Sequence, residues 1–300
     1  MRPATAAGSQ SLGAGLLRTA RPVQWAKNLL VFAAPGAAGV LDDGSQLANT
    51  VIAFACFCLA ASGTYFVNDV VDLEADRRHP TKRERPVASG LVPVPLAVAV
   101  GAGLIVAGTA GGLLVRWELA ATLAGYVALT LAYTLWLKHV PLLDLVAVAA
   151  GFVLRTVAGA AATDVPISEW FFIVASAGAL LMVTGKRSGE ASELGSDAAE
   201  VRSTLGVYTD SYLTYLRSVS SGVVLVAYCL WAFETAEVAG GDFPWYELSI
   251  IPFVVAVLRY AMILDQGGGA TPEDVVLRDR PLQAVIVVWA VLFGCGVYVG

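Results

Sequence analysis

Residues 49–76 read NTVIAFACFCLAASGTYFVNDVVDLEAD, an apolar run that ends in a cluster of carboxylates. The run is long enough for a helix that crosses a membrane, which takes about 20 mostly apolar residues. Asp69, Asp72 and Asp76 follow at positions i, i+3 and i+7, which places them on one helical face. Three carboxylates so close together repel one another unless a cation neutralises them. Their hard oxygen atoms suit Mg²⁺, with Mn²⁺ as an alternative; an ordinary solvated helix end is the competing interpretation.

The composition extends this interpretation to the whole chain. Of the 300 residues, 57% are hydrophobic and only 14% are charged, against about 25% charged residues in soluble domains. We therefore expect an all-α integral membrane protein with nine transmembrane helices. The predicted spans are 25–41, 49–71, 91–114, 118–137, 141–162, 168–185, 212–233, 247–265 and 281–299. Residues 1–20 are expected to form a flexible N-terminal tail, and residues 21–300 a single transmembrane domain.

The charge of the loops predicts the orientation. With the N-terminus in the cytoplasm, sixteen of the 19 Lys and Arg residues fall on the cytoplasmic side, and the opposite loops are acidic. Lys and Arg concentrate in cytoplasmic loops of membrane proteins. The cytoplasmic loops are then 72–90, 138–140, 186–211 and 266–280. We expect a multi-pass protein of the inner cell membrane whose active site faces the cytoplasm, embedded in the lipid bilayer and without a nucleic-acid partner.

A basic loop follows the carboxylates directly. Residues 77–86 hold five Lys and Arg residues within nine positions. Beside three carboxylates, this pattern favours an anion site in which metal ions take the bridging phosphate oxygens and basic side chains take the peripheral ones. For any single residue, the ordinary positive charge of cytoplasmic loops is an equally simple explanation.

Further polar residues recur near the same predicted membrane face. Tyr133 and Lys138 close the fourth predicted helix, and Lys138 either binds phosphate or extends to the membrane surface. Lys186 and Arg187 leave the membrane at the end of the sixth. The candidate substrate-binding residues are Lys27, Asn28, Lys82, Arg83, Tyr133, Lys138, Asp144, Lys186 and Arg187.

Two ionisable residues lie inside the fifth predicted helix. Asp144 and Arg155 are eleven residues apart, which is close to three turns, so both face the same way. Ionisable groups inside a membrane are costly and usually face a polar cavity or one another. Asp144 is therefore a candidate for the wall of the site, whereas the role of Arg155 is left open between structure and function.

The motif Asn68-Asp69-x-x-Asp72-x-x-x-Asp76 lies on the second helix and is followed by a basic loop. It resembles the UbiA superfamily of intramembrane prenyltransferases, which implies a UbiA-type helical bundle. The resemblance assigns metal binding to Asp69, Asp72 and Asp76, and catalysis to Asp69, Asp72 and Asn68. The second aspartate-rich motif of that superfamily is missing: Gly185-Lys186-Arg187 stands in its place.

Several ordered stretches are similar to one branch, the decaprenyl-phosphate phosphoribosyltransferases. They are Arg21-Pro-x-Gln24-Trp-x-Lys27-Asn28, His79-Pro-Thr-Lys82-Arg83, Leu142-Leu-Asp144, Arg155-Thr-x-Ala-Gly159 and Gly185-Lys186-Arg187. The resemblance implies Mg²⁺-dependent transfer of 5-phosphoribosyl from 5-phosphoribosyl-1-diphosphate to decaprenyl or another polyprenyl phosphate, with release of diphosphate, for a cell-wall arabinan precursor.

Two other functions stay open. A prenyltransferase that joins a prenyl diphosphate to an aromatic acceptor shares the aspartate motif, but it needs the second acidic motif. A secondary transporter would use Asp144 and Arg155 as a coupling pair near the bilayer midplane. The length of the polyprenyl chain and the oligomeric state, including a homo-oligomer, are not fixed by the sequence.

Overall fold

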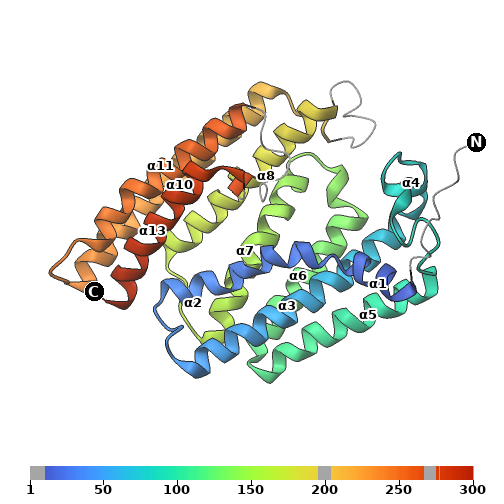
Figure 1. The fold of residues 1–300 in the computed structure, drawn as a ribbon, viewed down its shortest axis with the longest axis horizontal. Helices are drawn as coiled ribbons and strands as arrows, with labels where there is room; N and C mark the ends of the chain where they lie inside the picture. Colours follow the sequence, from blue (N-terminus) through green and yellow to red (C-terminus); the bar gives the residue numbers. More distant parts are fainter. Residues whose placement is uncertain (1–10, 195–203, 267–274, 277, 300) are drawn as a thin grey trace, which may run out of the picture.

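The computed structural model describes residues 11–194, 204–266, 275–276 and 278–299. Within these ranges the regular structure is entirely helical (Figure 1). Helices α3, α5 and α6 form one side of the bundle, α10, α11 and α13 form the other, and α7 and α8 lie between them. The predicted all-α class is therefore confirmed for the described part of the chain.

Eight long helices in the described ranges are apolar enough to cross a membrane, so the chain is a multi-pass membrane protein. They are α3 (Gly44–Val71), α5 (Val94–Gly111), α6 (Trp117–Leu135), α7 (Leu143–Thr163), α8 (Glu169–Leu194), α10 (Asp210–Ala239), α11 (Trp245–Asp265) and α13 (Arg280–Tyr298). Each overlaps one of the predicted spans from 49–71 onward. Short 3₁₀ turns, η3 (Gly112–Leu114) and η4 (Leu137–His139), follow α5 and α6.

The first predicted span, 25–41, takes a different form. It becomes the 3₁₀ helix η1 (Pro22–Phe32) followed by the short helix α2 (Ala33–Ala37). Because a 3₁₀ helix rises about 2.0 Å per residue, the two together cover roughly 30 Å, close to the thickness of the hydrocarbon core. The described structure thus has eight regular membrane-length helices, and a ninth crossing by η1 and α2 stays a prediction.

A close contact with α7 accompanies this 3₁₀ backbone. A Cβ atom added at Gly159 would lie 1.8 Å from the carbonyl oxygen of Val31. Only glycine lets η1 approach α7 so closely, because any side chain there would collide with backbone rather than with a mobile group.

Residues 12–20 do not form the expected flexible tail. They form α1 (Leu12–Ala20), whose first turn is capped by the Ser11 hydroxyl, which accepts a hydrogen bond from the Ala14 amide. Gly15 lies against the side chains of Leu91 and Val92. The cap and this packing hold the segment on the bundle; residues 1–10 lie outside the described residues.

The predicted cytoplasmic loops are partly ordered. Loop 72–90 contains α4 (Leu73–Arg78) and the 3₁₀ turn η2 (Lys82–Glu84). The loop predicted at 186–211 begins later, because α8 continues to Leu194; its residues 195–203 and most of 266–280 lie outside the described residues.

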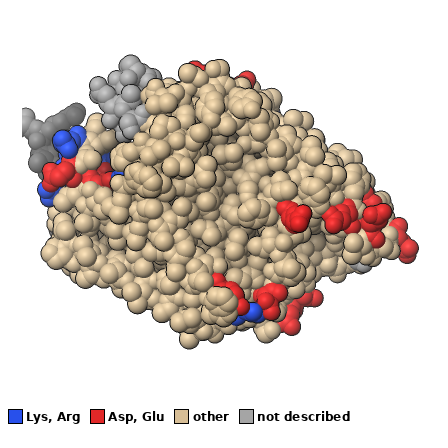
Figure 2. Space-filling model, turned by 180° about the vertical axis from the view of Figure 1, so that it is seen from behind, with Lys and Arg blue, Asp and Glu red and all other residues tan. Residues whose placement is uncertain are grey.

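Charged side chains gather at the edges of the molecule. Figure 2 shows one face with a wide uncharged surface between these edges. The edge that holds α4 displays both basic and acidic groups, whereas the edge at the turn between α10 and α11 displays acidic ones. An uncharged surface of this kind is expected for a protein surrounded by lipid.

Candidate active site

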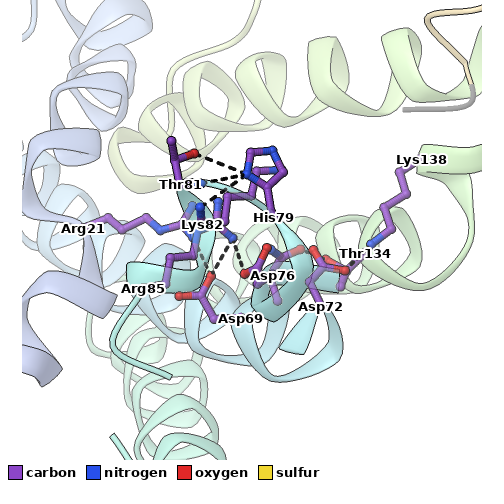
Figure 3. A network of polar contacts seen from close by, with 11 residues as sticks. Arg21, Asp69, Asp72, Asp76, His79, Thr81, Lys82, Arg85, Thr134 and Lys138 are labelled. Atoms are coloured by element: carbon purple, nitrogen blue, oxygen red, sulfur yellow. Dashed lines mark hydrogen bonds and ion pairs between the residues drawn. The ribbon is translucent and has the colours of Figure 1, made fainter. Parts of the chain in front are cut away.

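The acidic cluster, defined as Asp69, Asp72 and Asp76, lies where α3 meets α4 (Figure 3). Asp69 and Asp76 are buried, with 2% and 3% of their surface exposed. The Nη1 atom of Arg85 donates to both carboxylates, at 3.4 Å from Asp69 and 2.7 Å from Asp76. The structure therefore brings two of the three predicted metal ligands to one point.

Asp72 turns toward a different partner. It stands at the junction between the two helices, and its carboxylate accepts a hydrogen bond from Nζ of Lys138 at 2.6 Å. Within the described ranges, no three His, Cys, Asp or Glu residues lie close enough to hold a metal ion by themselves. A metal at this cluster would thus take its remaining oxygen ligands from a substrate or from water.

Arg21 supplies a second cation to the cluster. Its Nη2 atom lies 2.5 Å from Oδ1 of Asp69, and its guanidinium lies over the Tyr65 ring at 4.7 Å. From the sequence, Arg21 was named only in a stretch of family resemblance, and Arg85 was included only among the five basic residues of the loop. Neither was singled out, because charge alone does not reveal which of several basic residues reaches a given carboxylate.

The two predicted asparagines tie helices together. Asn68 accepts a hydrogen bond from the Thr134 hydroxyl of α6 at 3.1 Å. Asn28 is buried; it donates to Sγ of Cys58 at 3.2 Å and accepts from Nε of Arg155 at 2.9 Å. Asn68 thus lies beside the acidic cluster. Asn28 lies deeper and connects η1 to α3 and α7.

A cavity of about 260 Å³ opens beside the acidic cluster, between η1, α3, α6, α7 and α8. We call it the basic cavity because its charged lining residues within the described chain are all cationic: Arg21, Lys27, Arg155, Lys186 and Arg187. Tyr65, Tyr126 and Tyr133 add hydroxyl groups to its wall. Arg21 belongs to both the cavity and the acidic cluster and so joins them.

Arg187 is a buried member of this wall. Its guanidinium lies 3.3 Å from the Asp144 carboxylate, 2.7 Å from Glu190 and 3.4 Å from the Tyr133 hydroxyl. The structure therefore brings Asp144, Tyr133 and Arg187 together. Lys186 is more exposed, with its ammonium 3.9 Å from Glu190.

Tyr208 completes this network and was missed in the sequence. Its hydroxyl donates to Asp144 and accepts the backbone N–H of Leu142 at 2.8 Å. Leu142 has a φ of +67°, a conformation that costs energy for a side chain of this kind. Removal from solvent and the bond to Asp144 raise the pKa of Tyr208 above its ordinary value. No spacing in the sequence links residues so far apart.

The two candidate residues of the basic loop, Lys82 and Arg83, lie in different surroundings. Lys82 is half-buried near the acidic cluster, and its amide donates to the His79 ring at 3.4 Å. Arg83 is exposed on η2, so this structure does not bring it into the cluster. Desolvation and the neighbouring Lys82 lower the pKa of His79.

Asp144 and Arg155 do not pair with each other. Asp144 is engaged with Arg187 and Tyr208, whereas Arg155 donates to Asn28, Tyr126 and the Gly151 carbonyl. The two residues share helix α7, but they do not form the coupling pair that a transporter would use.

A second cavity, of about 480 Å³, is apolar and rich in aromatic side chains. We call it the aromatic cavity; it lies between η1, α2, α8, α10, α11 and α13. Its lining includes Phe32, Phe171, Trp231, Phe253, Trp289 and Phe293. Because η1 and α8 line both cavities, the two are neighbours within one bundle.

These features define a class: a multi-pass helical membrane protein with buried carboxylates and a basic cavity at one end of its bundle. The chain belongs to the UbiA prenyltransferase family, whose model matches residues 29–278. A decaprenyl-phosphate phosphoribosyltransferase of Mycolicibacterium smegmatis is 42% identical over 98% of this chain and 96% of its own. One from Corynebacterium glutamicum is 38% identical over 97% and 89%.

Solved structures share the fold. A UbiA homologue from Archaeoglobus fulgidus, bound to DMAPP and Mg²⁺, superposes with a TM-score of 0.73. It is 15% identical and covers 94% of this chain and 97% of its own. At this identity the likeness establishes the fold alone, and it confirms the UbiA-type bundle predicted from the sequence.

Proposed function

We propose that this protein transfers 5-phosphoribosyl from 5-phosphoribosyl-1-diphosphate to a polyprenyl phosphate such as decaprenyl phosphate, with release of diphosphate. The observation that carries the proposal is the contact of Arg21 with Asp69, which joins an acidic cluster to a cavity whose charged lining is cationic. A donor and an acceptor that both carry phosphate match such a site. The names of relatives that are 38–42% identical over nearly the whole chain support this substrate pair.

The acidic cluster fits a divalent cation held jointly with substrate. One nitrogen atom of Arg85 reaches both Asp69 and Asp76, so these are the two carboxylates that would hold the cation. Mg²⁺ typically binds through one or two carboxylates plus substrate phosphates and water. When bound there, Mg²⁺ or Mn²⁺ would offset the charge that develops on the leaving diphosphate. Asp72, which pairs with Lys138, would add a third carboxylate near this cation.

The basic residues have a separate role in this proposal. Lys27, Lys186 and Arg187 line the cavity into which the rest of the donor and the acceptor phosphate would extend. Arg187 is already held in place by Asp144 and Glu190, so its remaining N–H groups are fixed in direction. Prepositioned donors of this kind stabilise developing charge without reorganising during the reaction.

The chemistry needs no strong base on the protein. A phosphate oxygen of the lipid is already ionised and attacks C1 of the ribose, forming a new C–O bond. The bond from C1 to the diphosphate oxygen breaks, and its electron pair leaves with the diphosphate. The chain contributes positioning and charge stabilisation, which we expect to give inversion at C1 through in-line displacement.

The lipid chain would occupy the aromatic cavity. The hydrophobic effect favours transfer of the polyprenyl chain onto apolar side chains, and η1 and α8 continue from the basic cavity to this lining. The excess of Lys and Arg in the predicted loops supports a cytoplasmic site in the inner cell membrane, where the soluble donor is available. The product would serve as a precursor of cell-wall arabinan.

A test is to offer the purified protein labelled donors one at a time. With Mg²⁺ and decaprenyl phosphate, labelled phosphoribosyl diphosphate should give a labelled lipid. A labelled prenyl diphosphate with an aromatic acceptor should give no product. Prenylation without phosphoribosyl transfer would reject the proposal in favour of an aromatic prenyltransferase.

A further inference from the structure

We propose that Arg155 forms a binding site for a phosphate monoester at the inner end of the basic cavity. The inference rests on the proposed function, since it assigns one of the two phosphomonoesters of that reaction to a specific side chain. These are the phosphate of the lipid acceptor and the 5-phosphate of the ribosyl donor, which share the same chemistry.

The guanidinium of Arg155 is a buried positive charge. Arg155 is only 6% exposed and lies within the membrane-spanning helix α7. A guanidinium cannot lose its charge in a protein, and a buried cation is costly unless it is paired and hydrogen-bonded. Within the described part of the chain, the hydrogen bonds and ring contacts of Arg155 are all with neutral groups.

The hydrogen bonds of Arg155 leave donors unused. Nε donates to the Asn28 amide oxygen, Nη1 to the Gly151 carbonyl at 2.6 Å, and Nη2 to the Tyr126 hydroxyl at 3.2 Å. A guanidinium has five N–H groups, so each terminal nitrogen keeps one more. Two parallel N–H groups form the fork that binds phosphate through two oxygen atoms.

The surroundings fix the direction of that fork. The rings of Phe57, Tyr126 and Phe152 lie 5.0–5.4 Å from the guanidinium carbon. These rings and the three hydrogen bonds hold the guanidinium in one place, and Arg155 lines the basic cavity. A preorganised, partly desolvated cation binds an anion more strongly than a mobile one at the surface.

Depth distinguishes this site from the acidic cluster. The guanidinium lies level with the Gly151 carbonyl, seven residues along α7 from Asp144 and about 10 Å deeper. Asn28, its other partner, contacts Cys58, which precedes Asp69 by eleven residues of α3, or about 16 Å. A phosphate on Arg155 is therefore a different group from a diphosphate at Asp69 and Asp76.

The test is a binding measurement that does not depend on turnover. Purified full-length protein in detergent, with EDTA present, is titrated calorimetrically with farnesyl phosphate and with ribose 5-phosphate. Farnesol and ribose serve as ligands without charge. Arg155→Met is compared with wild type and with Arg116→Met, an arginine that pairs with Glu118 and Asp164 at another end of the bundle.

We expect wild type to bind at least one ester and neither neutral ligand. Arg155→Met should weaken the binding of that ester about 30-fold or more, because a buried charged hydrogen bond is lost. Arg116→Met should change the affinity for that ester by less than about threefold. The ester that loses affinity identifies the source: farnesyl phosphate for the lipid acceptor, ribose 5-phosphate for the donor.

Two results would overturn the proposal: an Arg155→Met protein that binds both esters like wild type, or a wild type that binds neither. If Arg155→Met does not fold, Arg155→Lys replaces it, and a folded Arg155→Lys with wild-type affinity would count against the site, because lysine lacks the fork. Ester binding at Arg155 without phosphoribosyl transfer would instead reject the proposed function alone.

Discussion

Arg21 and Asp69 are 48 residues apart in the sequence, yet their side chains lie 2.5 Å from each other. The contact links the start of η1 to the end of α3, and it places a cavity-lining cation against a buried carboxylate. It makes one continuous site from two parts, an acidic one suited to a metal-bound diphosphate and a basic one suited to phosphates.

Replacing Asp69 or Asp76 tests the acidic part. Asp69→Asn and Asp76→Asn each keep the shape of the side chain and remove its charge. We expect Mg²⁺-dependent transfer to fall by about 100-fold or more, since stabilisation of the leaving group is lost. Initial rates with saturating donor measure this effect.

Glu74 offers a matched control for these variants. It belongs to the same acidic stretch, but its side chain is 76% exposed and, among the described residues, pairs with Arg77. Glu74→Gln should keep activity within about twofold. An equal loss in Glu74→Gln and Asp69→Asn would mean that general negative charge, rather than this cluster, supports the reaction.

Removal of metal should leave the protein folded. In the described structure Arg21, Arg85 and Lys138 already neutralise the three carboxylates. Mg²⁺ alone should therefore change the Tm little, whereas Mg²⁺ with diphosphate should raise it by several degrees, because a ligand stabilises the state that binds it. Unfolding in EDTA, followed by intrinsic fluorescence on heating, would show that the metal is structural instead.

The sequence predicted most of the fold because apolar runs of membrane length are a strong local signal. It could not predict the 3₁₀ form of η1 or its close contact with α7 at Val31 and Gly159, which are far apart in the sequence. It predicted that the residues of α1 belong to a flexible tail, because a nine-residue segment with few charges has no distinctive pattern. The packing on Leu91 and Val92 that accompanies this helix cannot be read from the local sequence.

Several residues of the candidate site could be singled out from the sequence, but the contacts between them could not. Asp69, Asp76 and Arg187 were recognised from motif and position. Arg85 and Tyr208 were not singled out, because their partners are chosen by the three-dimensional path of two loops. The role of Asp72 in a metal site stays a prediction; the sequence did not indicate its hydrogen bond with Lys138, which Asp72 accepts at the junction of α3 and α4.

Gly159 gives a test of the fold itself. Gly159→Ala would push a methyl group into the carbonyl of Val31, so η1 must move away from α7. We expect a loss of stability of at least about 1–3 kcal/mol from this overpacking. Gly125→Ala is the control, since nothing lies within 4 Å of its added Cβ; equal melting temperatures for both variants would contradict the packing described.

Tyr208→Phe should loosen the wall that holds Arg187. The change leaves the Leu142 amide and one oxygen of buried Asp144 without the hydroxyl, at a cost of about 1–3 kcal/mol. We expect a lower Tm and a higher KM for the donor. Tyr215→Phe, at an exposed tyrosine on α10, should alter neither. A wild-type KM in Tyr208→Phe would show that this network does not contribute to donor binding.

The raised pKa of Tyr208 also predicts a pH dependence. As pH rises above about 10, tyrosine in the unfolded chain loses its proton, whereas Tyr208 in the folded protein still holds it. The unfolded state is then favoured, so this contribution to stability declines with rising pH. The Tm difference between wild type and Tyr208→Phe should therefore shrink above pH 10, and a difference that grows would contradict the assignment.

The central claim is that this site transfers phosphoribosyl to a lipid phosphate, and mass spectrometry of the lipid tests it most directly. Purified protein is incubated with 5-phosphoribosyl-1-diphosphate, Mg²⁺ and decaprenyl phosphate, and the lipid is extracted. We predict a lipid heavier by one phosphoribosyl group, formed in wild type and absent in Asp69→Asn or when EDTA is added. An unchanged lipid from folded, metal-supplied wild-type protein would contradict the account.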